Sequence, residues 1–331
     1  MRLYRRGDEG EPVRDIQDRL AALGFETDDR LGSFAAGTEA VVIAFQQARG
    51  LPGDGIVGPG TWRALVDAGF RLGDRMLYHR VPMMRGDDVA EVQRRLNSLG
   101  FDAGKVDGIF GPDTLRATLD FQANRRMAED GIVGREVVAE LELISRATKK
   151  PGREGVRERQ WLAALPPTIA GQHVYVDAAC RDPEEAETTW AAAVEFGGAI
   201  QILGGVPVYS RSADAFPSER VRALRANRMG TDFVVSFSEA KDGVPAVCYF
   251  ASQHSHSAAG EKLASAIAST LGMQSLGRTV PMLRDTRAPA VVISAEHIEP
   301  SLARAVADSI IDLLAAPREA PGNAVDAGRQ S

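Results

Sequence analysis

The side chains that could carry chemistry in this chain are few and lie mainly in its C-terminal half. Cys180 follows the strand-like stretch HVYVDA, and Glu185 comes five residues later. Cys and Glu are zinc ligands, and His254 or His256 could complete such a site. However, no closely spaced ligand pair of the HExxH or CxxC kind supports a metal site, and no positioned base is evident that would make Cys180 a nucleophile. The residues therefore favour a buried, inert thiol at position 180 over a ligand or a nucleophile.

These side chains need a rigid framework to position them, and the sequence after position 172 predicts a β-sheet. Apolar strand-like runs alternate with amphipathic helical patterns, which is typical of a mostly parallel sheet with helices on both faces. The predicted strands are 174–177, 206–210, 232–237, 245–251 and 290–294. The predicted helices are 185–203, 218–229, 258–271 and 299–315. In such a sheet the chemistry lies where parallel strands end, which is the position of Cys180.

The N-terminal part is a tandem repeat. DGIVG occurs at 54–58 and 130–134, an offset of 76 residues, and at this offset 20 of the 56 positions from Gly10 to Leu65 are identical without a gap. Each copy is predicted to form three short helices. In the first copy, Gly24 is predicted to end the first helix and Thr38 to cap the second. The three helices predicted in the first copy are 13–23, 38–48 and 61–65.

Composition narrows the classes of function. The chain has 331 residues, enough for two or three domains, and a net charge of −6 that argues against a nucleic-acid partner. Two cysteines are too few for a disulfide framework. The first dozen residues contain no apolar signal segment, and no apolar stretch approaches the roughly 20 residues of a membrane-spanning helix. A cytoplasmic location is therefore expected.

Each repeat resembles the type 1 peptidoglycan-binding module, an all-α three-helix bundle. The second copy carries the family's motifs VDGIFGPDT at 106–114, FQ at 121–122 and DGIVG at 130–134. The first copy departs from them, with Leu31 and Ala35 where the second has Asp107 and Gly111. The resemblance implies that the modules bind peptidoglycan fragments. Asp and Gly at these spacings are also what tight turns require, whatever the module binds.

From about residue 171 to 314 the order of features resembles that of zinc-dependent N-acetylmuramoyl-L-alanine amidases of the Amidase_3 type. The landmarks are VYVD (174–177), VYSR (208–211), DFVVSF (232–237), LRDT (283–286) and PAVVIS (289–294). The resemblance implies that two His and one Glu hold Zn²⁺ and that a second Glu acts as base. Here the three ligand positions hold Cys180, Glu185 and Ser238, and the base position holds Ser294.

This pattern predicts a degenerate amidase site with no catalytic residue and no bound metal, because neutral serine is neither a zinc ligand nor a general base. Glu184 and Glu187 are rivals for the position assigned to Glu185, and Glu296 lies two residues after Ser294. His297 is expected on the rim or on a solvated face. Zinc enters only under an alternative in which Cys180 and Glu185 recruit His254 or His256.

Two such modules before a degenerate amidase domain resemble a family of cytosolic actinobacterial amidase homologues over nearly the whole chain, most specifically at 75–101 and 184–211. The resemblance implies a regulator that a membrane Ser/Thr kinase phosphorylates. It then activates the enolpyruvyl transferase that commits UDP-N-acetylglucosamine to peptidoglycan precursors, and it is linked to the lipid II flippase at the membrane. The family's phosphothreonine lies in a C-terminal tail, whereas the tail here has no Thr and only Ser331.

The predicted domains are peptidoglycan-binding-like modules at 1–72 and 73–146, a linker at 147–170, a degenerate amidase-like α/β domain at 171–316 and a disordered tail at 317–331. The basic stretch 147–160 is predicted to be a solvated linker, or else a strip that touches anionic lipid or an acidic partner. The favoured function is that of a non-catalytic regulator. Two alternatives stay open, a zinc amidase with a rearranged site and a sensor that binds muropeptides or lipid II.

Overall fold

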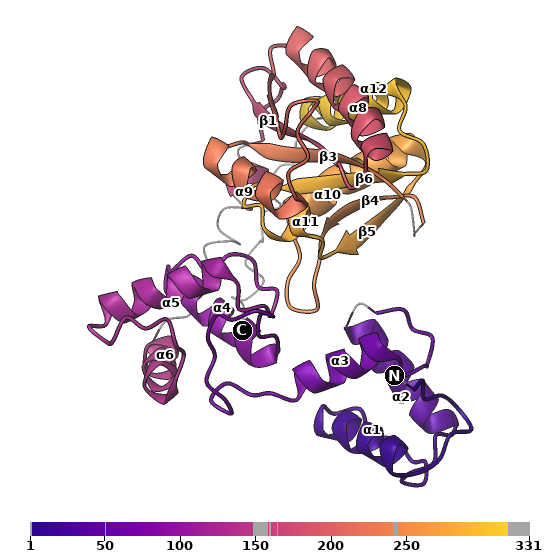
Figure 1. Ribbon diagram of the computed structural model, residues 1–331, viewed down its shortest axis with the longest axis vertical. Helices are drawn as coiled ribbons and strands as arrows, with labels where there is room; N and C mark the ends of the chain where they lie inside the picture. The colour runs from indigo at the N-terminus through magenta and orange to yellow at the C-terminus, as the bar shows by residue number, and fades with distance from the viewer. Residues whose placement is uncertain are drawn as a thin grey trace, which may run out of the picture.

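Two small helical modules precede an α/β domain in this protein, as Figure 1 shows. A computed structural model describes residues 2–49, 51–147, 158, 160–163, 165–240 and 244–316. The predicted tail and the greater part of the basic stretch lie outside these residues. The first helical bundle is called module 1 and the second module 2.

Each module is a bundle of three helices around its own apolar core, as the repeat predicts. The helices of module 1 are α1 (Glu11–Ala22), α2 (Ala36–Ala48) and α3 (Pro59–Ala68). Those of module 2 are α4 (Asp87–Ser98), α5 (Pro112–Asn124) and α6 (Arg135–Ala147). A buried glutamine on the first helix of each module holds the following loop. In module 2, Gln93 donates to the carbonyl of Ile109 and to the hydroxyl of Thr114.

The prediction that Thr38 caps the second helix is wrong. Helix α2 begins two residues earlier, after Ala35, and Thr38 lies in its first turn. The cap is Asp29, whose carboxylate accepts hydrogen bonds from the backbone N–H groups of Ala35, Gly37 and Thr38 at 2.5–3.2 Å. The hydroxyl of Thr38 is instead used by Gln17, at 2.9 Å. The helix start is therefore fixed by a side chain several residues upstream rather than by its own first residue.

The α/β domain contains a six-stranded sheet in the order β2-β1-β3-β6-β4-β5. The strands are β1 (His173–Ala178), β2 (Val206–Tyr209), β3 (Phe233–Glu239), β4 (Ala246–Phe250), β5 (Gln274–Arg278) and β6 (Ala290–Ala295). All neighbours pair parallel except β4 and β6, which are antiparallel. The sheet is thus mostly parallel, and strands β1, β3 and β6 end at the same edge.

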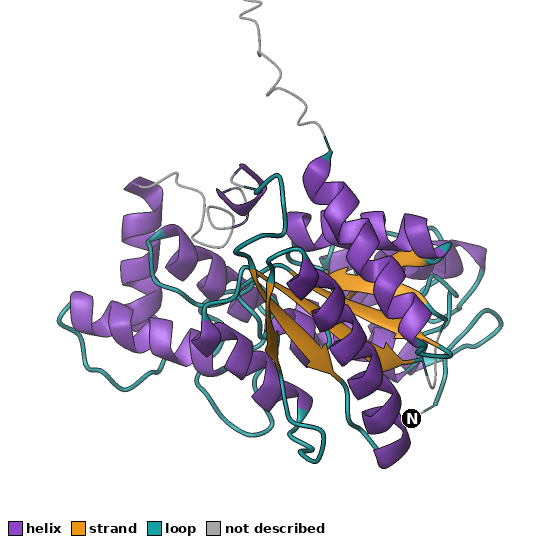
Figure 2. Cartoon of the chain, turned by 90° about the horizontal axis from the view of Figure 1, so that it is seen from above, coloured by secondary structure: helices purple, strands orange, loops and turns teal. Residues whose placement is uncertain are grey.

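Helices cover both faces of this sheet (Figure 2). One face carries α8 (Pro183–Ile202), α10 (Ala258–Leu271) and α12 (Pro300–Ala315), and the other carries α9 (Glu219–Met229) and the short α11 (Pro281–Arg284). Side chains alternate between the faces, so Val174 and Val176 belong to one apolar core and Tyr175 to the other. Strand β5 and helix α11 are absent from the sequence prediction, and residues 160–163, predicted as part of a linker, are helical. In the described part of the chain, no helix combines the length and apolar character needed to cross a bilayer.

Candidate functional site

Three of the predicted site residues meet where β1, β3 and β6 end. Cys180 follows β1, Ser238 lies in β3 and Ser294 lies beside it in β6. All three line a cavity of about 400 Å³ between the sheet and α9. The parallel direction of the three strands brings these residues together, although more than a hundred positions separate the first from the last.

Glu185 is the fourth predicted residue, and its carboxylate points inward from the first turn of α8. Its side chain is fully buried, whereas Glu184 and Glu187 are exposed. Asp182 caps the helix by accepting the N–H of Glu185 at 3.0 Å. The helix start therefore places one carboxylate of the three candidates at the sheet edge.

The carboxylate of Glu185 forms an ion pair with the guanidinium of Arg181. Arg181 donates from Nε to both carboxylate oxygens at 3.0 Å and from Nη2 to Oε1 at 2.5 Å, and its backbone N–H adds a bond of 2.7 Å. The backbone N–H of Glu239 and the hydroxyl of Ser238 also donate to Oε1, at 3.1 and 3.2 Å. Both oxygens of Glu185 thus have their lone pairs directed at protein donors.

These contacts shift the pKa of the pair in a consistent direction. Burial disfavours the charged carboxylate of Glu185, but the hydrogen bonds from Arg181 and Glu239 outweigh burial and hold its pKa below the usual value. The side-chain hydrogen bond to Glu185 raises the pKa of Arg181, although burial opposes it. The pair is therefore ionised at neutral pH.

A second arginine holds a second buried carboxylate beside Cys180. Arg222, on α9, donates from Nε to Asp177 at 2.7 Å, and the hydroxyl of Ser236 donates to the other oxygen of Asp177 at the same distance. Nη1 of Arg222 donates to Sγ of Cys180 at 3.2 Å, and the thiol donates to the carbonyl of Pro217 at 3.4 Å. Burial opposes the charge of Arg222, but Asp177 outweighs burial and raises its pKa.

The remaining candidates do not reach this site. Because β4 is antiparallel to β6, the loop after β4 that carries His254 and His256 leaves the sheet at the opposite edge. His254 lies near Asp87 of module 2, with Nε2 3.5 Å from a carboxylate oxygen. Glu296 and His297 are exposed. The structure therefore does not bring either histidine of the HSH sequence to Cys180 and Glu185.

Zinc, which the amidase resemblance implies, needs three or four N, O or S donors with free lone pairs. At this sheet edge Glu185 is bound by Arg181, the Cys180 thiol lies against Arg222, and Ser238 and Ser294 offer neutral hydroxyls. Among the residues that the structure describes, no three His, Cys, Asp or Glu side chains are grouped so that they could hold a metal ion. This donor set does not fit Zn²⁺.

Sequence reasoning missed both arginines. A basic residue four positions before a glutamate at a helix start is a recognisable ion-pair pattern, and it could have identified Arg181. Arg222 gave no local signal, since it reaches Asp177 across 45 residues of sequence.

Comparison with known proteins gives the same two-part organisation. Residues 9–65 and 85–141 match PG_binding_1, the family of a peptidoglycan binding domain. The N-acetylmuramoyl-L-alanine amidase CwlM of Mycobacterium tuberculosis is 34% identical over 329 aligned residues, covering 88% of this chain and 81% of the relative. The N-acetylmuramoyl-L-alanine amidase CwlL of Bacillus licheniformis is 30% identical, covering 43% of this chain and 46% of the relative.

Among solved structures, an N-acetylmuramoyl-L-alanine amidase from Clostridium difficile 630 is similar to 44% of this chain, over 96% of its own length. The sequence identity is 19% and the TM-score is 0.37.

Proposed function

The chain belongs to the family of the mycobacterial protein CwlM, and on that premise we propose that it is a non-catalytic regulator of peptidoglycan precursor synthesis. It works through protein contacts in the cytoplasm, at the inner face of the membrane. Its proposed main partner is the enolpyruvyl transferase that acts on UDP-N-acetylglucosamine. The lipid II flippase and a Ser/Thr kinase are further proposed partners.

One observation carries the non-catalytic part of this proposal. Arg181 holds both carboxylate oxygens of Glu185, the single acidic residue at the predicted ligand positions. Amidase chemistry of this type needs a metal that acidifies water and a carboxylate that removes the proton. A guanidinium donates hydrogen bonds but has no vacant coordination position at which to bind and acidify water, and the hydroxyl of Ser294 is not a base at neutral pH. Both requirements for hydrolysis therefore fail at the same place.

Metal analysis of the purified full chain tests the proposal directly. After incubation with excess Zn²⁺ and gel filtration, we expect well under one zinc per chain and no cleavage of a muropeptide. The matched control combines Arg181→Ala with Cys180→His, Ser238→His and Ser294→Glu, which removes the competing cation and supplies the amidase pattern. We expect this variant to retain zinc. Stoichiometric zinc together with cleavage by the unmodified chain would refute the proposal.

The regulatory part needs a separate measurement. Purified enolpyruvyl transferase from the same organism is assayed with and without the full chain, before and after treatment with the kinase. A rise in turnover is expected. Unchanged turnover under all conditions, with no complex on gel filtration, would rule out direct activation.

The muropeptide sensor is a second candidate because a cavity of about 400 Å³ persists at the sheet edge, lined by Arg222, Ser236 and Ser294. A cavity of this volume is within the range of ligand pockets. Calorimetry with a soluble muropeptide separates this candidate from the first. Heat that disappears in Arg222→Lys would favour the sensor, and no heat at millimolar ligand would exclude it.

A further inference from the structure

The segment 102–113 of module 2, here called the docking loop, lies against the α/β domain. It consists of most of the loop between α4 and α5 and the first two residues of α5. It contains most of the VDGIFGPDT motif. Lys105 in this loop is only 8% exposed, and Val106 is 6% exposed. A lysine is rarely this buried unless it is paired, so the burial calls for specific partners.

The ammonium group of Lys105 has such partners on the α/β domain. Nζ donates to the carbonyl of Leu283 at 2.6 Å, across 178 residues of sequence. It also lies 4.8 Å from the centre of the Phe250 ring, within the range of a cation–π contact. These contacts attach the docking loop to α11 and to the end of β4.

The backbone of the docking loop fits the same surface. The carbonyl of Val106 accepts hydrogen bonds from the hydroxyls of Ser252 and Ser255, at 3.1 and 2.9 Å. Gly108 lies so close to His254 that a Cβ atom there would be 2.8 Å from Nε2 of the ring. The backbone conformation favours glycine in both modules, with φ +70° at Gly108 and +81° at Gly32, and in module 2 the missing side chain also lets His254 approach closely.

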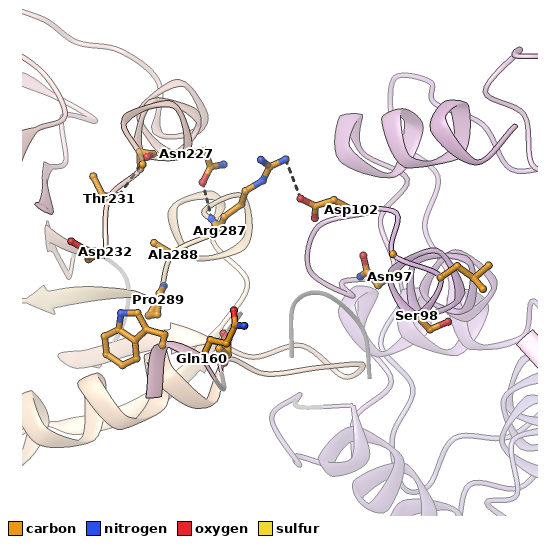
Figure 3. A pocket seen from close by; sticks show the side chains of 16 residues that line it. Asn97, Ser98, Asp102, Gln160, Asn227, Thr231, Asp232, Arg287, Ala288 and Pro289 are labelled. Atoms are coloured by element: carbon orange, nitrogen blue, oxygen red, sulfur yellow. Dashed lines mark hydrogen bonds and ion pairs between the residues drawn. The ribbon is translucent and has the colours of Figure 1, made fainter. Parts of the chain in front are cut away.

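Ion pairs surround this contact. Arg284 lies 3.6 Å from Asp107, and Arg287 lies 3.5 Å from Asp102 and 3.8 Å from Asp113. Figure 3 shows Arg287 reaching from the α/β domain to Asp102, while its backbone N–H is held by Asn227. The acidic side chains of the motif therefore face arginines of the α/β domain.

A cavity of about 880 Å³ lies beside these ion pairs, between module 2 and the α/β domain (Figure 3). Two of the amides that line it are already hydrogen-bonded within the protein. Asn97 is bonded to the backbone of Ala103 and Gly104, and Asn227 to that of Asp285 and Arg287. These two amides stabilise the loops on either side of the cavity, so we assign no ligand to it.

Module 1 provides an internal comparison, because the repeat offset pairs every docking-loop residue with one of its own. Asp29 stands where module 2 has Lys105, and it caps α2 inside its own module. Leu31 stands where module 2 has Asp107 and is 60% exposed. Among the described residues, the side-chain hydrogen bonds of Asp29 all stay within module 1. The same loop is therefore turned outward in one copy and inward in the other.

We propose that the docking loop of module 2 is an intramolecular interface element. It joins module 2 to the α/β domain through Lys105, Val106 and the surrounding ion pairs, and it is closed to external peptidoglycan fragments. The equivalent loop of module 1 stays open to solvent. The two copies of the repeat have thus diverged into an internal connector and an outward-facing module.

Chemical labelling of lysine amines in the full chain tests this interface. The chain has five lysines, and Lys262 on α10 is exposed and serves as the internal reference. With an acetylating reagent and peptide mass spectrometry, we expect Lys105 to react at least about ten times more slowly than Lys262. Lys105 is buried and donates a hydrogen bond to Leu283, and both features keep the reagent from its amine nitrogen. Equal rates in the unmodified chain would overturn the proposal.

A charge reversal on the α/β domain shows whether docking causes the protection. Arg287→Glu turns two attractive contacts into repulsive ones at a side chain that is 38% exposed. Circular dichroism of the variant checks that the α/β domain remains folded. We expect the labelling rate of Lys105 to rise roughly 2- to 30-fold, the range for two partly exposed charge pairs. Adding Asp102→Arg should restore part of the protection.

The matched control is Arg125→Glu, which breaks an ion pair to Glu140 inside module 2 and touches no residue of the α/β domain among the contacts described. We expect it to leave the labelling of Lys105 unchanged. If Arg287→Glu leaves Lys105 fully protected, the protection comes from the fold of module 2 itself and the proposal fails. It also fails if the control exposes Lys105 to the same extent.

Discussion

Removing the guanidinium of Arg181 should destabilise the α/β domain, because the buried carboxylate of Glu185 then loses its cation. Loss of one partner from a fully buried ion pair costs about 3–5 kcal/mol. Arg181 is 51% exposed, and Glu185 keeps its bonds from the backbone N–H groups of residues 181 and 239. We therefore expect Arg181→Ala to lower the free energy of unfolding by about 2 kcal/mol, the range for a charge-assisted hydrogen bond.

The pH dependence of this loss follows from the pKa of Glu185. Its pKa in the folded protein is lower than in the unfolded chain, so the ion pair stabilises the fold above the unfolded value and this stabilisation is lost as the pH falls through the folded pKa. In Arg181→Ala, the side-chain hydrogen bonds that oppose the effect of burial are lost, and the pKa of Glu185 rises. The difference in stability between the two proteins should be largest near pH 7 and should shrink towards pH 4.

Urea unfolding followed by the fluorescence of Trp161 and Trp190 measures this difference, in a Trp62→Phe background that removes the signal of module 1. A double-mutant cycle with Glu185→Gln isolates the pair, and we expect a coupling energy of 1–2 kcal/mol, of the order measured for charged hydrogen bonds. A coupling below roughly 0.5 kcal/mol, or a loss that does not change with pH, would refute the account of the site given above.

Three further predictions concern the fold. Burial lowers the pKa of His254 to about 4 despite nearby Asp87, so the free energy of unfolding should fall by at most about 3 kcal/mol as the pH drops from 6.5 to 4. In urea titrations, His254→Gln should make the free energy of unfolding less dependent on pH over this range. Gly197→Ala would place Cβ 2.1 Å from the Tyr209 hydroxyl and should cost about 1–3 kcal/mol, whereas Gly198→Ala meets nothing within 4 Å and should raise the melting temperature. Gln93→Leu removes the bonds to Ile109 and Thr114 and should destabilise module 2 by about 2–4 kcal/mol, seen as earlier hydrogen exchange in α4 and α5.

The elements that the sequence predicted are those whose pattern is local. Alternating apolar residues predicted β1, continuous apolar runs predicted β3 and β6, and the repeat predicted the helices of both modules. Strand β5 was missed because QSLGR carries one large apolar residue and pairs only at the edge of the sheet. The capping of α2 was missed because Asp29 acts from outside the helix.

The site was predicted in part, for a related reason. Strand order and direction placed Cys180, Ser238 and Ser294 at one edge, which the amidase resemblance anticipated. The direction of β4 leaves no trace in its residue pattern, so the sequence could not exclude His254 from the site. The sequence also could not show that Arg222 reaches from α9 to Asp177 on β1, because that contact depends on how α9 packs against the sheet.

The two arginines explain how an amidase fold can persist here with a donor set that does not suit zinc. Asp177 and Glu185 are fully buried, and a buried carboxylate needs a compensating positive charge or enough donors to replace water. A guanidinium meets that electrostatic requirement while offering no open coordination position. It also opposes metal binding, because a divalent ion about 4 Å from Arg181 would be repelled by about 8 kcal/mol at an effective dielectric constant of 20. Supplying histidines at positions 180 and 238 would therefore not be enough to restore a zinc site while Arg181 remains.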